Sequence, residues 1–163
     1  MHPMRSLAAA VLAVLITSCS SSSHERLCNR FFTPYPDLVS QRARNKLNGE
    51  FLDAMALYAK GQYAEAMPGL QRVVDRDPRN AAARIYLVNV LLAEGDPYKA
   101  EMHLDFLENS RDRMYSDQVD WYNTLCWLCE GDTARAGWKA REIAAKPHTY
   151  RQQAAQLAKA LAP

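Results

Sequence analysis

The sequence predicts an all-α fold made of stacked helix hairpins, and three observations support this prediction. First, a short turn signature occurs three times, at 61–66 (GQYAEA), 95–100 (GDPYKA) and 131–136 (GDTARA). Second, the leading glycines of these signatures are 34 and 36 residues apart. Third, each signature lies between two stretches in which apolar residues recur at helical spacing, so each is expected to join the two helices of a hairpin. With 163 residues, the chain has room for one such domain.

The residue types within the signature suit a tight turn between two helices. Glycine ends the first helix because it adopts the left-handed backbone conformation without steric cost. Asp96 and Asp132 are expected to cap the second helix, and Pro97 suits the first helical position, where its missing N–H has no partner to lose. The alanine that closes each signature leaves room for the paired helix. In the first signature, Gln62 replaces the capping Asp.

These features resemble the tetratricopeptide repeat family, whose repeats are 34 residues long and form one helix hairpin each. The resemblance implies a right-handed α-solenoid of three hairpins plus a C-terminal capping helix, in a domain of residues 37–163. The repeats are placed at about 47–80, 81–116 and 117–148, with a Pro-containing break (DPRN) between the first two. Pro68 falls in the second helix of the first repeat and is expected to kink it.

Both ends of the predicted stack are expected to carry additional structure. Residues 149–152 (TYRQ) are interpreted as a capping box, and the apolar residues that follow share one helix face, which predicts a capping helix over 149–161. Residues 37–46 are expected to form a helical lead-in. The preceding segment, 31–36 (FFTPYP), is aromatic and cannot continue a helix because of its prolines.

Residues 1–18 are interpreted as a lipoprotein signal peptide, because a basic start precedes an apolar run at 7–16 that is too short to span a bilayer. The end of this leader (ITSC) resembles the bacterial lipobox, which implies cleavage before Cys19 and acylation of Cys19, for example with palmitate. The alternative is a plain secretory signal in which Cys19 happens to follow the cut. Residues 19–36 are then expected to form a lipid-anchored flexible tether. The expected location is the bacterial cell envelope, with the outer membrane and the periplasmic side favoured.

In the tetratricopeptide repeat pattern, the first helix of each hairpin lines a concave groove, and the resemblance implies that this groove binds a protein partner. The implied groove residues are Phe51, Met55, Tyr58, Ile85, Asn89, Leu92, Trp121, Leu125 and Leu128. Most are apolar or aromatic, so the expected partner is a peptide or helical segment of an envelope protein, with Asn89 bonding its backbone. Two alternatives stay open. In the first, several of these residues are ordinary core residues between adjacent hairpins. In the second, residues 31–36 fold back and occupy the groove, so that no partner is required there.

Three cysteines lie in the predicted mature domain, Cys28, Cys126 and Cys129. They are interpreted as buried structural thiols, as a disulfide that involves Cys28, or as a centre for metal or redox chemistry. Cys126 and Cys129 are three residues apart on one predicted helix, so they point the same way and would share a metal with His103 or His148. A thiol-redox or metal-binding envelope protein that uses Cys126 and Cys129 is therefore the alternative function.

Charge and motif content argue against other classes of protein. The chain has 20 Lys and Arg residues against 18 Asp and Glu residues, which does not provide the concentrated basic face of a nucleic-acid-binding protein. It contains neither a Gly-rich phosphate loop nor a Ser nucleophile elbow. We therefore expect a membrane-tethered adaptor or scaffold that is not an enzyme, needs no cofactor or metal, and binds neither nucleic acid nor a small-molecule substrate.

Overall fold

The computed structural model describes residues 22–111 and 113–162, and over these residues the chain is all-helical, as predicted. The helices are α1 (Ser23–Phe31), α2 (Gly49–Tyr58), α3 (Tyr63–Arg76), α4 (Ala81–Ala93), α5 (Pro97–Glu108), α6 (Ser116–Glu130), α7 (Thr133–Ala144) and α8 (Arg151–Ala160). None of these helices is long and apolar enough to cross a bilayer. The predicted signal peptide and Cys19 lie outside the described residues.

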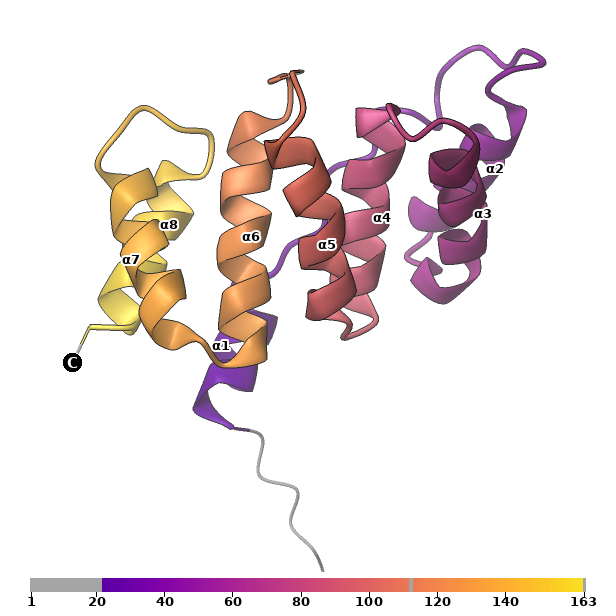
Figure 1. Cartoon of the computed structure of the whole chain (residues 1–163). Coiled ribbons are helices and arrows are strands. Elements are labelled where there is room, and N and C mark those ends of the chain that lie inside the picture. Colours follow the sequence, from indigo (N-terminus) through magenta and orange to yellow (C-terminus); the bar gives the residue numbers. More distant parts are fainter. Residues whose placement is uncertain (1–21, 112, 163) are drawn as a thin grey trace, which may run out of the picture.

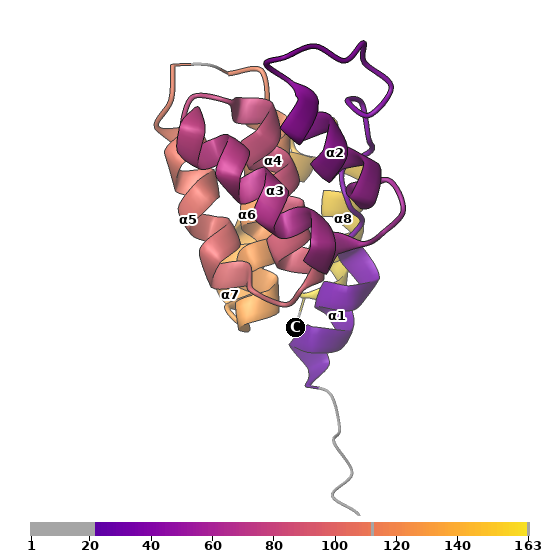
Figure 2. The ribbon, with the colours of Figure 1, turned by 90° about the vertical axis from the view of Figure 1, so that its right-hand side faces the viewer.

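Helices α2 to α8 form a row in chain order, and each helix packs against the next (Figure 1). Hairpin α2/α3 lies within residues 47–80, hairpin α4/α5 lies within 81–116, and hairpin α6/α7 spans 116–144. A view turned by 90° places α3, α5 and α7 along one side of the row, whereas α1 lies on the other side (Figure 2). The stacked hairpins agree with the predicted α-solenoid.

The hairpin turns have the predicted geometry. The backbone is left-handed at all three turn glycines, with φ of 72° at Gly61, 78° at Gly95 and 90° at Gly131. The Asp96 carboxylate accepts a hydrogen bond from the Lys99 N–H at 3.1 Å, and the Asp132 carboxylate accepts one from the Arg135 N–H at 3.0 Å. Gln62 makes no side-chain cap bond at the start of α3. The two aspartates therefore cap α5 and α7 as expected.

Small residues allow the paired helices to approach closely. The signature alanines Ala66, Ala100 and Ala136 are completely buried at the start of α3, α5 and α7. Helix α3 runs continuously through Pro68, so the proline does not end the helix. The first hairpin is therefore a full member of the stack despite its proline.

The predicted helix over residues 37–46 is wrong, because no helix forms between α1 and α2. The Asp37 carboxylate accepts hydrogen bonds from the N–H groups of Val39 at 2.8 Å and Ser40 at 2.9 Å. An aspartate that bonds backbone groups two and three residues ahead stabilises a turn in place of a helix. The chain therefore enters α2 through an irregular loop.

The predicted flexible tether at 19–36 contains a docked helix, because α1 packs against α6. The Ser22 hydroxyl accepts a hydrogen bond from the Glu25 N–H, and the Glu25 carboxylate accepts one from the Ser22 N–H. These two bonds form a capping box that starts α1. The pattern Ser-x-x-Glu is visible in the sequence, but it overlaps a run of serines that suggested a flexible segment. From residue 22 onward, the predicted tether is part of the folded domain.

The C-terminal helix α8 lies where a capping helix was predicted and packs against α7. The predicted capping box at 149–152 is wrong, because Tyr150 is the N-cap residue and makes no side-chain cap bond. Both the N–H and the hydroxyl of Thr149 bond instead to the Asp117 carboxylate of α6, at 2.7 and 2.6 Å. Thr149 thus ties the loop before α8 to α6.

Gly131→Ala should destabilise the domain more than Gly61→Ala. Both substitutions place an L-residue in the left-handed region, at a cost of about 1–2 kcal/mol. A Cβ at position 131 would also lie 3.3 Å from the His24 ring of α1, whereas nothing lies within 4 Å of a Cβ at position 61. Urea unfolding measures the difference between the two variants. The difference should vanish in a His24→Ala background, and its persistence there would contradict the contact between α1 and this turn.

Candidate functional site

The predicted concave groove is formed by α2, α4 and α6, which are the first helices of the three hairpins. The nine residues predicted to line it all belong to these helices and are between 0 and 8% exposed. They are Phe51, Met55, Tyr58, Ile85, Asn89, Leu92, Trp121, Leu125 and Leu128. Their side chains are therefore covered in this structure rather than presented to solvent. All of the nine but Asn89 belong to the hydrophobic core of the stack, as one of the two alternatives proposed, and Trp121 stacks on Tyr150 at 5.5 Å.

The rest of the cover comes from residues 32–38, which we call the groove segment. It follows α1 and crosses the row of helices on the side away from α5 (Figure 1). Four side chains from α2, α4 and α6 bond to its backbone: those of Tyr58, Tyr86, Asn89 and Tyr122. The structure therefore confirms the alternative in which this part of the chain folds back and occupies the groove.

Two prolines decide which backbone groups the groove segment presents to the groove. Pro34 and Pro36 have no N–H, so Tyr35 carries the only backbone donor between them. Asn89 Oδ1 accepts this N–H at 2.8 Å. The Tyr58 hydroxyl donates to the Tyr35 carbonyl at 2.7 Å. Both polar backbone groups of Tyr35 are thus satisfied by side chains of the groove.

Two further tyrosines bind the segment on either side of Tyr35. The Tyr122 hydroxyl of α6 donates to the Thr33 carbonyl at 3.1 Å. The Tyr86 hydroxyl of α4 donates to the Pro36 carbonyl at 3.0 Å and accepts the Leu38 N–H at 2.9 Å. Together with Tyr58 of α2, these contacts come from all three hairpins, so the segment links the whole stack.

Burial keeps the tyrosine hydroxyls protonated. It raises the pKa of Tyr58 and Tyr122 far above the ordinary value of a phenol, and it raises the pKa of Tyr86 to about 12. A protonated phenol donates a hydrogen bond, which is what the three carbonyl groups of the segment require. The bonds are therefore independent of pH in the physiological range.

The Tyr35 side chain fills an aromatic cluster inside the groove. Its ring centroid lies 5.7 Å from that of Tyr86 and 6.3 Å from that of Tyr115. Tyr86 lies in turn 5.1 Å from Tyr58 and 6.2 Å from Phe51. These separations are those of favourable aromatic pairs. The aromatic anchor that was expected from a partner is here supplied by the chain itself.

Tyr86 and Tyr122 also bind the groove segment, although the sequence pattern did not predict them as groove residues. Each directly follows a residue that the family pattern assigned to the groove, Ile85 or Trp121. The residue type indicates this role, because a buried tyrosine needs a hydrogen-bond partner for its hydroxyl, whereas a phenylalanine does not.

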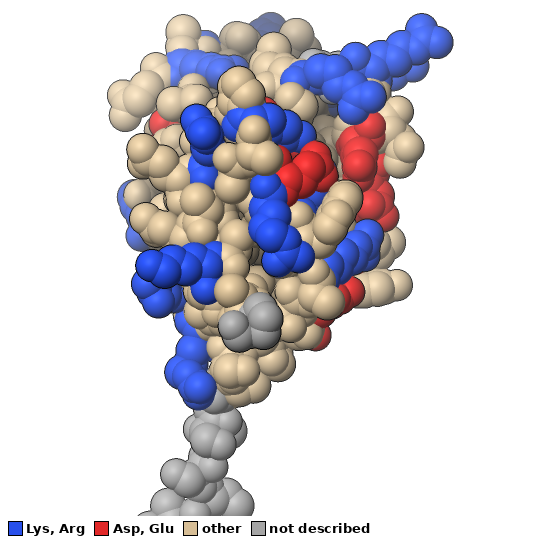
Figure 3. Space-filling model, turned by 90° about the vertical axis from the view of Figure 1, so that its left-hand side faces the viewer, with Lys and Arg blue, Asp and Glu red and all other residues tan. Residues whose placement is uncertain are grey.

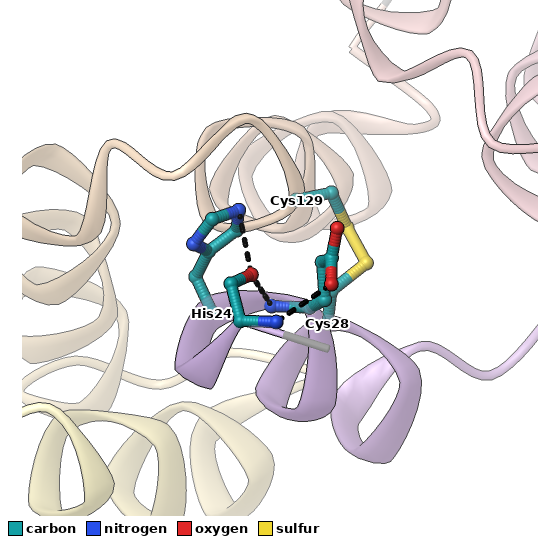
Figure 4. The surroundings of a disulfide bond; sticks show 5 residues. His24, Cys28 and Cys129 are labelled. Atoms are coloured by element: carbon teal, nitrogen blue, oxygen red, sulfur yellow. Dashed lines mark hydrogen bonds between the residues drawn. A yellow bond between two sulfur atoms is a disulfide. The ribbon is translucent and has the colours of Figure 1, made fainter. Parts of the chain in front are cut away.

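A disulfide bond between Cys28 and Cys129 holds α1 against the end of α6 (Figure 4). The two cysteines are 101 residues apart in the sequence. Within α1, His24 bonds through its ring to the Ser22 hydroxyl at 3.2 Å. Because the groove segment follows α1 directly, the disulfide fixes one end of the segment that fills the groove.

The remaining cysteine, Cys126, is a buried thiol, as one interpretation of the sequence proposed for all three cysteines. Burial raises its pKa well above the ordinary value, so the thiol is protonated and unreactive. The predicted companions of a metal site lie elsewhere, with His103 bonded to Arg84 and His148 near Asp117. No group of three potential metal ligands occurs among the described residues.

Comparison with known proteins identifies the family. Residues 57–107, from the end of α2 almost to the end of α5, match the family model described as Tetratricopeptide repeat. The chain thus contains tetratricopeptide repeats, as its turn signatures suggested. No curated protein and no solved structure gives a significant match.

Replacing both Cys28 and Cys129 with Ser should release α1 and the groove segment. A disulfide that closes a loop of this length contributes about 4.7 kcal/mol in the chain-entropy model. We expect a lower free energy of unfolding in urea and faster proteolysis and hydrogen exchange at 32–38. Cys126→Ala is the control, since it removes a buried thiol away from the segment. Unchanged protection of the segment in the double variant would contradict its dependence on the disulfide.

Asn89→Leu should destabilise the domain more than Asn123→Leu. The first change leaves the partly buried Tyr35 N–H without its side-chain acceptor, at a cost of about 1–3 kcal/mol. Asn123 is a matched buried asparagine of α6, but its Oδ1 has no hydrogen-bond partner among the described residues. Urea unfolding gives the two energies, and hydrogen exchange at the Tyr35 amide reports the segment. Equal losses with unchanged exchange would show that Asn89 does not hold it.

Proposed function

We propose that this chain is a lipid-anchored adaptor of the bacterial cell envelope, which holds a protein partner close to a membrane. Stacks of tetratricopeptide repeats serve as protein-interaction modules, and the repeats of this chain belong to that family. The proposed anchor is an acylated Cys19, on the basis of the lipobox-like end of the leader. The residue after Cys19 is Ser and not Asp, which favours the outer membrane and its periplasmic side.

The observation that carries the proposal is the position of α1 relative to Cys19. Ser22 caps α1, which is docked on α6 and covalently bonded to it. The three residues from Cys19 to Ser22 reach at most about 11 Å, even when fully extended. A lipid on Cys19 would therefore hold the stack directly at a membrane surface, without a long flexible spacer.

The charge of the nearby end of the stack supports this placement. Helix α7 carries three Lys or Arg residues and α8 carries two, whereas Glu142 is the one acidic residue in the two helices. Figure 3 shows Lys and Arg side chains spread over this end of the molecule, with fewer Asp and Glu side chains. Arg135 and Lys139 pair with acidic side chains of the protein, so Arg141, Arg151 and Lys159 are the residues of these helices that we propose for contact with lipid headgroups. Basic side chains near an anionic leaflet contribute about 1 kcal/mol each.

The filled groove restricts how a partner binds. A peptide or helix of an envelope protein would enter the concave groove only in exchange for residues 32–38, which the tyrosines, Asn89 and the disulfide hold in place. We therefore propose that the intact protein binds its partner outside the groove. The thiol-redox alternative gains no support, since Cys129 pairs with Cys28 and not with Cys126, which is buried.

Cys19→Ala should abolish membrane attachment while leaving the fold unchanged, because residue 19 precedes the folded domain. Expression with the native leader, separation of membrane from soluble fractions, and labelling with radioactive palmitate measure the effect. Cys126→Ala serves as the control and should remain labelled and membrane-bound. A Cys19→Ala protein that still carries palmitate, or a wild-type protein that carries none, would rule out the proposed anchor.

A further inference from the structure

The outer face of α5 bears an apolar stripe that no other element covers. Tyr98, Met102 and Phe106 are 69, 59 and 43% exposed. They are spaced by four residues, so they lie above one another on one helix face. Helix α5 packs into the stack through a different face, which contains Ala100, Leu104 and Leu107. The stripe therefore lies outside the face through which α5 packs into the stack, although the Phe106 ring also contacts the Arg84 guanidinium of α4.

Two hollows adjoin this stripe and share Phe106 as a common wall. One has a volume of about 340 Å³ and is lined by Arg84, Lys99, Met102, His103 and Phe106. The other has a volume of about 640 Å³ and lies where the loop before α4 meets the end of α5, lined by Arg79, Ala81, Phe106, Leu107, Ser110 and Arg111. The surface is thus an indented groove and not a flat patch.

The two hollows are basic. Arg79, Arg84, Lys99 and Arg111 line them, whereas no Asp or Glu among the described residues does so. Lys99 pairs with Asp96 at the start of α5, away from Phe106. Glu101 is directed to the other flank of α5, where it bonds to Trp127 of α6 and Arg135 of α7. An acidic ligand would therefore meet a complementary surface.

Arg84 is the least expected residue of this surface, because its charge is buried without a bonded carboxylate. The residue is 6% exposed, and its guanidinium carbon lies 3.8 Å above the centre of the Phe106 ring. It donates to the Pro78 carbonyl and lies 2.9 Å from His103 Nδ1, but its Nε has no partner among the described residues. Burial lowers the pKa of Arg84, and the charge of Asp75 acts in the opposite direction. A buried charge of this kind favours an incoming carboxylate.

The position of the surface argues for a protein and against a membrane as its occupant. Helix α5 lies on the side of the stack opposite the groove segment (Figures 1 and 2). The larger hollow is at the end of α5 far from the start of α1 (Figure 1). An anchor on Cys19 would hold the edge of the stack next to the start of α1 at the bilayer, which leaves this hollow facing away from the lipid.

We propose that the stripe and its two hollows form a docking surface for an acidic amphipathic helix of a partner protein, which rests on the adaptor role proposed above. The stripe extends for about 12 Å along α5, or two helical turns. Apolar residues of the partner helix at i, i+3 or i+4 and i+7 would contact Tyr98, Met102 and Phe106. Its flanking Asp and Glu residues would pair with Arg79, Arg84 and Arg111.

Site-specific photocrosslinking in the full-length, membrane-anchored protein tests this surface. The photoreactive residue p-benzoylphenylalanine replaces Met102 in one variant and Gln153, an exposed residue of α8, in a control variant. Each is expressed in the bacterium that encodes the chain, and the crosslinked peptides are mapped by mass spectrometry. We expect position 102, but not position 153, to crosslink to an acidic segment with helical apolar spacing.

Charge reversal provides the second measurement. Arg79→Glu should reduce the crosslinking yield at position 102 by about tenfold or more, because it places a carboxylate opposite the acidic helix. Lys60→Glu is the matched control, since it reverses one exposed charge in the turn between α2 and α3, and it should change the yield less than about twofold. Equal effects of the two substitutions would overturn the proposal.

The other outcomes separate this inference from the adaptor role. Crosslinks from position 102 to lipid, to a second copy of this chain or to a basic segment would overturn the acidic-helix surface. Capture of a partner through position 153 and not through 102 would overturn it as well, while leaving the adaptor role intact. Absence of any protein crosslink at both positions would overturn the acidic-helix surface, and a Cys19→Ala protein that still fractionates with the membrane would overturn the proposed anchor.

Discussion

The groove segment is extended because of its two prolines, and this constraint shapes the concave side of the stack. A helical wall has no free backbone groups to offer, since its N–H and carbonyl groups bond within the helix. The partly buried backbone of Tyr35 must therefore bond to side chains of the groove, and Asn89 and Tyr58 supply these partners. This requirement explains why an amide and several phenols stand in an otherwise apolar groove. The groove is built to bind an extended peptide, and in this structure that peptide belongs to the same chain.

The path of the N-terminal region changes how the repeat stack holds together. In a simple repeat protein each unit contacts only its neighbours, so stability is close to a sum of local terms. Here the disulfide joins α1 to α6, while the groove segment bonds to residues of α2, α4 and α6. One continuous piece of chain thus links the first hairpin directly to the third. We expect this connection to make a short stack of three hairpins more cooperative than its repeats alone would be.

The two sides of the stack have different chemistry, and this difference assigns them different roles. The concave side is neutral, aromatic and filled, which suits a permanent internal contact. The outer face of α5 is apolar at Phe106, basic around it and uncovered. A domain that closes one of its faces with its own chain becomes a rigid support for the other. This arrangement differs from the groove-binding adaptor implied by the family pattern, because the residues of that pattern are used here for folding.

The sequence by itself determined the repeats. The turn glycines, the capping residues Asp96 and Asp132 and the buried alanines act within a few residues of one another, so their pattern was sufficient to predict the hairpins and their order. Only the tertiary structure decided where the N-terminal region packs. Cys28 forms a disulfide with Cys129, which is 101 residues away in the sequence, and the Tyr35 N–H bonds to Asn89, which is 54 residues away. Sequence periodicity describes local geometry, whereas these contacts depend on where the finished stack places groups that are distant along the chain. For the same reason, the sequence offered the return of residues 31–36 to the concave side only as one alternative. The contacts with Tyr58, Asn89 and Tyr122 in the folded molecule decided it.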